Sequence, residues 1–326
     1  MASHVVDIPK TFGALLVGGL FASMLAGVGV VQVYIYFRLY PKDFPHLKFL
    51  VLFVWLLDTC QTTFIWAALW EYFIDGYGSE LKIDYIPWSI SMTILFTAIL
   101  TFAVHCFYIH RIHILSHRNW WITLSIFILA LARLGSALLT TAKTLHLHSY
   151  LSFKLDLWWL FTLGLALSSC VDVLITASLC FLLQSSRGGT TSLNHIIDSL
   201  IRYAFEAGFL TSAGTFVSML CWLTMRHNLI FMGVYFAVSK FHTNSLLVIL
   251  NTRQQYRSAR SRVSSEFDFP TLQLDTRRKR NTEDMSASHS RRDESITDFH
   301  RNGKVMINVE TSVHRHNSHE PQSSTE

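Results

Sequence analysis

The sequence predicts an all-α polytopic membrane protein, a seven-transmembrane-helix bundle followed by a disordered C-terminal tail. Hydrophobic residues make up 51% of the 326 residues and charged residues only 15%, against about 25% charged residues in ordinary soluble domains. The charges are also unevenly placed, because 13 of the 27 Lys and Arg lie between Arg253 and Arg315. The chain therefore divides into a membrane domain at 1–252 and a polar tail at 253–326.

Seven apolar runs predict the transmembrane helices. A helix needs about 20 apolar residues to cross a hydrocarbon core of about 30 Å, and the runs lie at roughly 12–37, 48–70, 86–109, 120–142, 157–183, 203–225 and 229–251. The first run resembles a secretory signal, but it is about 26 residues long and follows only Lys10, so we expect it to be retained. Short connectors between the runs predict antiparallel neighbours.

Lys and Arg in the flanks predict the orientation, because cytoplasmic loops are enriched in both. Eleven lie on one side of the membrane and five on the other. The first set is Arg38, Lys42, Lys48, Arg111, Arg118, Arg187, Arg202, Arg253, Arg257, Arg260 and Arg262, and the second is Lys10, Lys82, Lys143, Lys154 and Arg226. We expect the N-terminus outside and the C-terminus in the cytoplasm of a plasma or internal membrane.

Small residues and tryptophans suggest how the helices pack and where they end. Gly19, Ser23 and Gly27 are spaced four apart, which puts them on one helical face where a neighbour can approach closely. Tryptophans are expected in interfacial belts, with Trp70, Trp88, Trp158, Trp159 and Trp222 at the outer ends and Trp120 and Trp121 at the inner side.

The residues most informative about function are the ionisable ones within the spans or at their edges. They are Asp58, His105, Arg133, Asp172, Glu206 and Lys240. A charge at a helix centre costs about 2.5–3.5 kcal/mol on insertion scales, so we expect these charges to neutralise one another. The simplest hypothesis pairs Lys240 with either Asp58 or Asp172, with Asn244 on the same helical face as Lys240. The resulting network is interpreted as a register-fixing core, a cavity for a ligand or an ion, an ion path, or a switch whose charge pair breaks on activation.

Several other functions are not favoured by the sequence. Lys240 suggests a retinal Schiff base, but the third span offers His105 and threonines and no acid as counter-ion. The stretch HRIHILSH carries His110, His113 and His117 with Cys106 upstream, yet a basic loop with interfacial histidines is the preferred interpretation over a metal site. Phosphate loops and catalytic motifs are not recognisable. We therefore expect no enzyme activity, no metal and no cofactor.

The tail predicts partners at the membrane surface. It is rich in Ser, Arg, Asp, Glu, His and Asn, a composition typical of disorder. Arg253, Arg257 and Arg260 recur at roughly helical spacing and predict contact with anionic lipids. A cytosolic partner at the tail is also expected, whereas the net charge of +5 gives no indication of nucleic-acid binding. The oligomeric state is left open.

The carboxyl half resembles a known family. The stretches are SSCVDVLITASLCFLLQSSR, IIDSLIRYAFEAGFLTSAGTFVSMLCWLTM and NLIFMGVYFAVSKFHTNSLLVILNTR. They resemble a family of seven-span membrane proteins from basidiomycete fungi, defined by a domain of unknown function that would cover about 168–254. The family segment reads Lys-x-Tyr-(Ala or Ser)-Asn-Ser-Leu-Leu-x-x-Leu-Asn-x-Arg. Lys240, Asn244, Ser245, Asn251 and Arg253 fit it, while His242 and Thr243 depart from it.

The resemblance supports the architecture and implies no activity, cofactor or site residue. Seven spans with an outside N-terminus and a polar tail favour a receptor-like or sensory protein. A small-solute or ion transporter or channel is the alternative, because it would use the charges within the membrane, and a non-signalling membrane scaffold is a third interpretation.

Overall fold

The computed structural model describes residues 12–76, 84–116, 118–147, 149–187, 191–225 and 228–253. Over these residues the chain is helical, which confirms the all-α class. The α-helices are α1 (Ala14–Leu39), α2 (Pro45–Trp70), α3 (Trp88–Leu115), α4 (Trp120–Leu147), α5 (Tyr150–Asp156), α6 (Trp158–Ser185), α7 (Thr191–Thr224) and α8 (Ile230–Asn251), and a short π-helix, η2 (Glu71–Asp75), extends α2.

Six of these helical segments are long and apolar enough to cross a membrane. They are α1, α2 with η2, α3, α4, α6 and the part of α7 from Ile197 to Thr224. Their apolar side chains are widely exposed on the outside of the bundle, as at Val17, Met24 and Phe181. A multi-pass membrane protein satisfies both observations, because lipid solvates apolar side chains that water would not.

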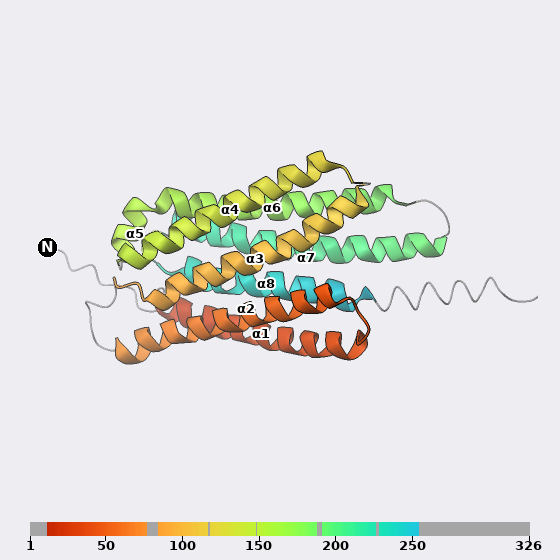
Figure 1. Cartoon of the computed structure of the whole chain (residues 1–326). Coiled ribbons are helices and arrows are strands. Elements are labelled where there is room, and N and C mark those ends of the chain that lie inside the picture. The colour runs from red at the N-terminus through yellow and green to blue at the C-terminus, as the bar shows by residue number, and fades with distance from the viewer. Residues whose placement is uncertain are drawn as a thin grey trace, which may run out of the picture. The chain divides into compact units, whose positions relative to one another are not determined.

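The helix α8 lies at the centre of the bundle. It packs against α1, α2, α3 and α7, and Figure 1 shows it, in cyan, between the α1–α2 pair and the remaining helices. It falls outside the six apolar segments, and its middle, SKFHTNS at 239–245, is polar. Nearly all of its side chains are buried. The polar middle of α8 is therefore enclosed by the surrounding helices.

The contact between α1 and α8 is close and in parallel register. Gly18 and Gly233 meet where the two helices cross, and a Cβ atom added to Gly18 would lie only 2.4 Å from the Cα of Gly233. Further along, the side-chain amide of Asn244 donates to the Leu25 carbonyl at 3.1 Å. Asn251 donates in the same way to the Gln32 carbonyl at 2.9 Å.

The expected small-residue face is confirmed only in part. Gly19 faces α2, where an added Cβ would lie 2.7 Å from Leu69. Ser23 accepts a hydrogen bond from Trp66 Nε1 at 2.8 Å, also on α2. Gly27 has no neighbour within 4 Å of such a Cβ. The packed face therefore includes Gly19 and Ser23 but not Gly27. The closest approach of α1 to another helix is at Gly18, which meets α8.

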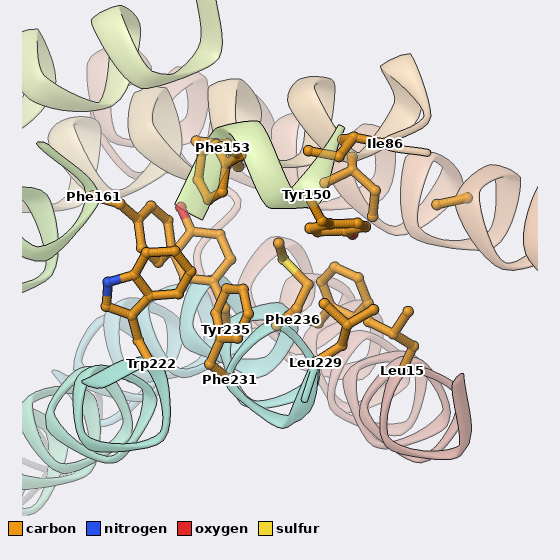
Figure 2. Packing of buried hydrophobic residues seen from close by; sticks show 14 of the residues in the cluster. Leu15, Ile86, Tyr150, Phe153, Phe161, Trp222, Leu229, Phe231, Tyr235 and Phe236 are labelled. Atoms are coloured by element: carbon orange, nitrogen blue, oxygen red, sulfur yellow. The ribbon is translucent and has the colours of Figure 1, made fainter. Parts of the chain in front are cut away.

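An aromatic cluster closes the end of the bundle near α5. The ring of Trp222 lies 4.8 Å from the rings of both Phe161 and Phe231, centroid to centroid. Phe153 of α5 points into this cluster, as Figure 2 shows, with its ring 5.6 Å from that of Trp222. Edge-to-face pairs of this kind stabilise beyond their buried area, so α5, which the sequence did not predict, is held as a lid over the bundle.

Trp222 also corrects the prediction of interfacial tryptophans. Its side chain is only 5% exposed, whereas Trp70, Trp88, Trp120, Trp121, Trp158 and Trp159 are at least half exposed. The Trp222 indole satisfies its N–H by donating to Thr162 Oγ1 at 2.9 Å. All seven tryptophans lie near the ends of spans, so their position in the sequence could not show that Trp222 is buried beneath α5.

Candidate functional site

The polar middle of α8 directs its side chains to two opposite sides of the helix. A helix turns by about 100° per residue, so Lys240, Thr243 and Asn244 share one side and His242 lies on the other. The first side faces α1 and α2, and the second faces α3 and α6. One helix thus carries two buried polar clusters, which we call the lysine cluster (Lys240, Asp58, Thr62 and Thr243) and the histidine cluster (His105, Asp172 and His242).

The lysine cluster pairs Lys240 with Asp58. The ammonium nitrogen lies 3.0 Å from Asp58 Oδ2, and it also donates to the Asp58 carbonyl at 2.9 Å and to Thr62 Oγ1 at 2.6 Å. The Lys240 side chain is fully buried. All three N–H groups therefore have acceptors on α2, which offsets the cost of removing the charge from water.

The second oxygen of Asp58 is used as well. Thr243 donates from Oγ1 to Asp58 Oδ1 at 3.1 Å. Gln61, one turn away on α2, is fully buried, and both polar atoms of its amide lack a hydrogen-bond partner among the described residues. Buried amides normally find a partner, so a water molecule beside Gln61 is expected.

The histidine cluster joins three helices around Asp172 of α6. Asp172 Oδ1 lies 2.9 Å from His105 Nε2 of α3 and 3.2 Å from His242 Nε2 of α8. The three side chains are between 1% and 4% exposed. Asp172 is therefore the partner of two histidines and not of Lys240, which resolves the choice that the sequence left open.

Arg133 lies outside both clusters. It is buried on α4, and its guanidinium donates to the Ala98 carbonyl at 3.5 Å. None of the described carboxylates lies within ion-pair distance of it. It lines a small cavity of about 30 Å³ together with Ser168 and Tyr235. Glu206, the remaining ionisable residue of the predicted set, is exposed on α7.

Asn244 belongs to the helix contact between α1 and α8. Besides its bond to Leu25 it donates to the Lys240 carbonyl at 3.0 Å, while its own oxygen is buried and without a partner among the described residues. It lies on the same side of α8 as Lys240, as predicted, but its side chain contacts backbone and not the ammonium group.

Arg253 closes the opposite end of the bundle from α5. Its guanidinium lies 2.5 Å from Asp43 in the connection between α1 and α2 and 4.8 Å above the Tyr40 ring. Burial opposes ionisation of Asp43, but hydrogen bonds from Arg253 and Tyr36 outweigh it and hold the pKa of Asp43 below its ordinary value. The predicted lipid contacts Arg257 and Arg260 lie outside the described residues.

The interfacial histidines form a separate region at the end of α3. His110 and His113 line an open cleft of about 270 Å³ with Cys106 and Trp120. The His113 ring lies 4.8 Å from the Trp120 ring, which favours a packing role. His117 lies outside the described residues.

Sequence reasoning missed several members of the two clusters. It did not select His242 or Thr243, although both stand at the positions where the chain departs from the family pattern. The spacing of His242 from Lys240 was a usable signal, because a polar residue two positions on points to the opposite side of the helix, and in a central helix that side also faces protein. Asp43 was also missed, since its partner Arg253 lies 210 residues away in the chain.

No curated protein and no solved structure matches the chain. One family model does match, over residues 168–255. This part of the chain supplies α6, α7 and α8, and with them Asp172, Lys240 and His242. By this match, the carboxyl part of the chain is similar to a family of unknown function, DUF6534.

Proposed function

We propose that the chain is a sensory membrane protein with seven spans, in which the α8 network is the part that changes state. The proposal takes α8 as the seventh span. Its 22 residues cover about 33 Å as a helix, enough for a hydrocarbon core of about 30 Å. Its polar side chains face inward, so enclosure by α1, α2, α3 and α7 compensates for its polar middle.

The observation that carries the proposal is the double attachment of α8. The lysine cluster ties it to α2, and the histidine cluster ties it to α3 and α6. Each attachment is ionic or charge-assisted and buried, so breaking one leaves the other in place. In the proposed switch, α8 would exchange one of these attachments while the other holds, which gives the two states that signalling requires.

The small size of the cavities beside the buried charged groups supports a switch over a solute carrier. The cavities beside the histidine cluster and Arg133 measure about 20 and 30 Å³, room for about one or two water molecules each. Solute transport would need a site that admits a larger molecule. We also propose a non-enzymatic function, and from the Lys and Arg in the flanks we propose that the N-terminus lies outside and the C-terminus in the cytoplasm.

An ion or proton pathway is the second candidate, and one observation favours it. Buried polar atoms of Gln61, Ser168 and Ser239 have no partner among the described residues. Such atoms need water, and a hydrated polar interior is what a conducting path would use.

The proposal is tested by measuring helix movement and flux on the same variants. Spin labels at exposed His46 of α2 and Arg202 of α7 report the distance between these helices in nanodiscs, with the native cysteines replaced by alanine. We expect Asp58→Asn/Lys240→Met, which removes the charge pair without leaving one charge alone, to shift or broaden the distance distribution. Lys143→Met, an exposed lysine of α4, should leave it unchanged.

Proteoliposomes made with the same variants separate the candidates. A sensory protein carries no current and no proton flux in any of them. Flux in the wild type that disappears in the double variant would establish the pathway instead. Identical distance distributions in all three proteins would reduce the network to a structural core.

A further inference from the structure

The histidine cluster has the composition and convergence of a metal site. His105, Asp172 and His242 come from three different helices, and one ligand atom from each lies within 4.8 Å of the other two. Two ligands of one zinc ion are at most about 4.4 Å apart, since each bond is about 2.0–2.2 Å long. The two nitrogen–oxygen distances, 2.9 and 3.2 Å, already fall inside that limit.

The hydrogen bonds of His242 leave a place for a cation. Its Nδ1 lies 2.9 Å from the Val238 carbonyl, and because a carbonyl only accepts, Nδ1 must carry a proton. In a neutral imidazole Nε2 then presents a lone pair, and that lone pair faces the carboxylate of Asp172 at 3.2 Å. Two acceptors in contact require a positive species between them, either a second proton or a metal ion.

The same bond to Val238 is the support that metal-binding histidines usually have. Histidine ligands commonly donate their other ring N–H to a backbone carbonyl or carboxylate, which fixes the tautomer and aims the free nitrogen at the metal. His242 is therefore oriented as a ligand in advance.

Unused polar atoms and a small cavity lie beside the cluster. Asp172 Oδ2 is buried and has no hydrogen-bond partner among the described residues, and the same holds for His105 Nδ1. A cavity of about 20 Å³ adjoins Asp172, with Thr176, Thr211 and Ser245 in its wall. One water molecule fits a space of this size, and the three hydroxyl groups offer it hydrogen-bond partners.

We propose that His105, Asp172 and His242 bind a divalent transition-metal ion of the Zn²⁺ class. The two imidazole nitrogens and the Asp172 carboxylate supply three ligands, and a water molecule in the adjoining cavity supplies the fourth. Imidazole ligands suit zinc and its first-row neighbours, whereas Mg²⁺ and Ca²⁺ prefer all-oxygen sites. The ion joins α3, α6 and α8, and the site does not depend on the proposed sensory function.

The test uses the full chain, purified in detergent without a polyhistidine tag, and the metal ion alone. Metal content is measured after equilibration with Zn²⁺ and removal of loosely bound ion. The wild type should retain one equivalent more than His242→Gln. Affinity at this site should fall by more than about 100-fold in the variant, since changes to outer-shell groups alone cost roughly 10–100-fold.

A matched control addresses the other histidines. His110→Gln/His113→Gln removes the two histidines of the cleft at the end of α3 and should retain the same equivalent as the wild type. Histidines of residues 254–326 are common to all variants and cancel in the comparison.

A titration of the wild type with Co²⁺ does not depend on any variant folding. Occupation of the site gives the visible ligand-field absorption of a low-coordinate nitrogen–oxygen site, and Zn²⁺ abolishes it stoichiometrically. The proposal is overturned if no such absorption appears, or if His242→Gln and wild type retain equal amounts of zinc. In either case a proton and not a metal joins the three groups. If His242→Gln does not fold, His105→Gln takes its place.

Discussion

At the scale of single residues, the buried lysine is stable because its partners are complete. Lys240 uses all three of its N–H groups on α2, and Asp58 uses both carboxylate oxygens on α8. Neither side chain has an unused charge-bearing group. The cost of burial therefore becomes visible only when one partner is removed.

The first prediction concerns that removal. Lys240→Met leaves Asp58 buried without a counter-charge, and we expect it to cost about 3–5 kcal/mol. Asp58→Asn/Lys240→Met should recover roughly 1–3 kcal/mol of this. The free energies of unfolding are compared in one detergent, with Lys143→Met as the exposed-lysine control. If the double variant loses as much as Lys240→Met and Asp58→Asn together, each measured alone, the charges do not interact.

The second prediction concerns acid. The pKa of Asp43 is held below its ordinary value by Arg253 and Tyr36 despite burial. Its stabilising effect is therefore complete above the unfolded pKa of about 3.9 and is lost as pH falls through the lower folded pKa. Melting temperatures measured from pH 6 to pH 3 should drop less below pH 4 in Asp43→Asn than in the wild type.

The control for the acid prediction is Asp156→Asn, at an exposed aspartate of α5. Its curve should run parallel to that of the wild type. If Asp43→Asn shows the same acid sensitivity as the wild type, the contact between Asp43 and Arg253 does not stabilise the fold.

All but Glu206 of the ionisable residues predicted within the spans are buried, but the sequence predicted only part of how they pair. The sequence alone marks Asp58, Asp172 and Lys240 as buried partners, because a charged side chain in the hydrocarbon core costs free energy unless it is neutralised. It cannot say which acid meets Lys240, since Asp58 and Asp172 lie at similar depth on different helices. That choice depends on the rotation of α8 about its axis, which the closest helix contacts fix.

At the scale of helices, the register between α1 and α8 is fixed by small residues and asparagines. Gly18 and Gly233 permit the close crossing. Asn244 and Asn251, two turns apart, bond to carbonyls of Leu25 and Gln32, which are also two turns apart. Because the spacing of the bonded residues is the same on both helices, α1 and α8 stay side by side and parallel between the two bonds.

The third prediction tests the crossing. Gly18→Ala places a methyl group against the backbone of Gly233, so the helices must separate, and we expect a loss of about 1–3 kcal/mol as in other overpacked interiors. Gly27→Ala has open space around the new methyl group and should be neutral or stabilising by up to about 1 kcal/mol from helix propensity. Equal effects of the two substitutions would place the closest contact elsewhere.

Helix boundaries were predicted at the ends of the apolar runs. The predicted boundaries are wrong where a helix continues into polar sequence. The start of α7 at Thr191 precedes the predicted 203, because nothing in NHIIDSLIR breaks a helix even though it is too polar to count as a span. The lid helix α5 was missed for a related reason. Its seven residues are too few to show a period, and its position depends on Phe153 finding the aromatic cluster.

At the scale of the whole molecule, the number of spans decides the arrangement of the termini. Six helical segments qualify on length and apolar content alone. If α8 is a seventh span, the two termini lie on opposite sides of the membrane. If α8 does not cross, they lie on the same side.

The fourth prediction follows from this parity. Epitopes added at the N-terminus and at the C-terminus are probed in intact and permeabilised cells. The N-terminal epitope should be accessible in intact cells, and the C-terminal one only after permeabilisation. Accessibility of both termini under the same condition would rule out seven spans, and the reverse pattern would invert the orientation.

The position of α8 also has a consequence for biosynthesis. It is the last of the described helices to leave the ribosome, yet its main neighbour is α1, the first. A helix carrying Lys240 is poorly soluble in lipid alone, so its entry should depend on Asp58 and Asp172 being already in place. The earlier helices must then wait in the membrane with Asp58 unpaired, whereas Asp172 already has His105 of α3 as a partner.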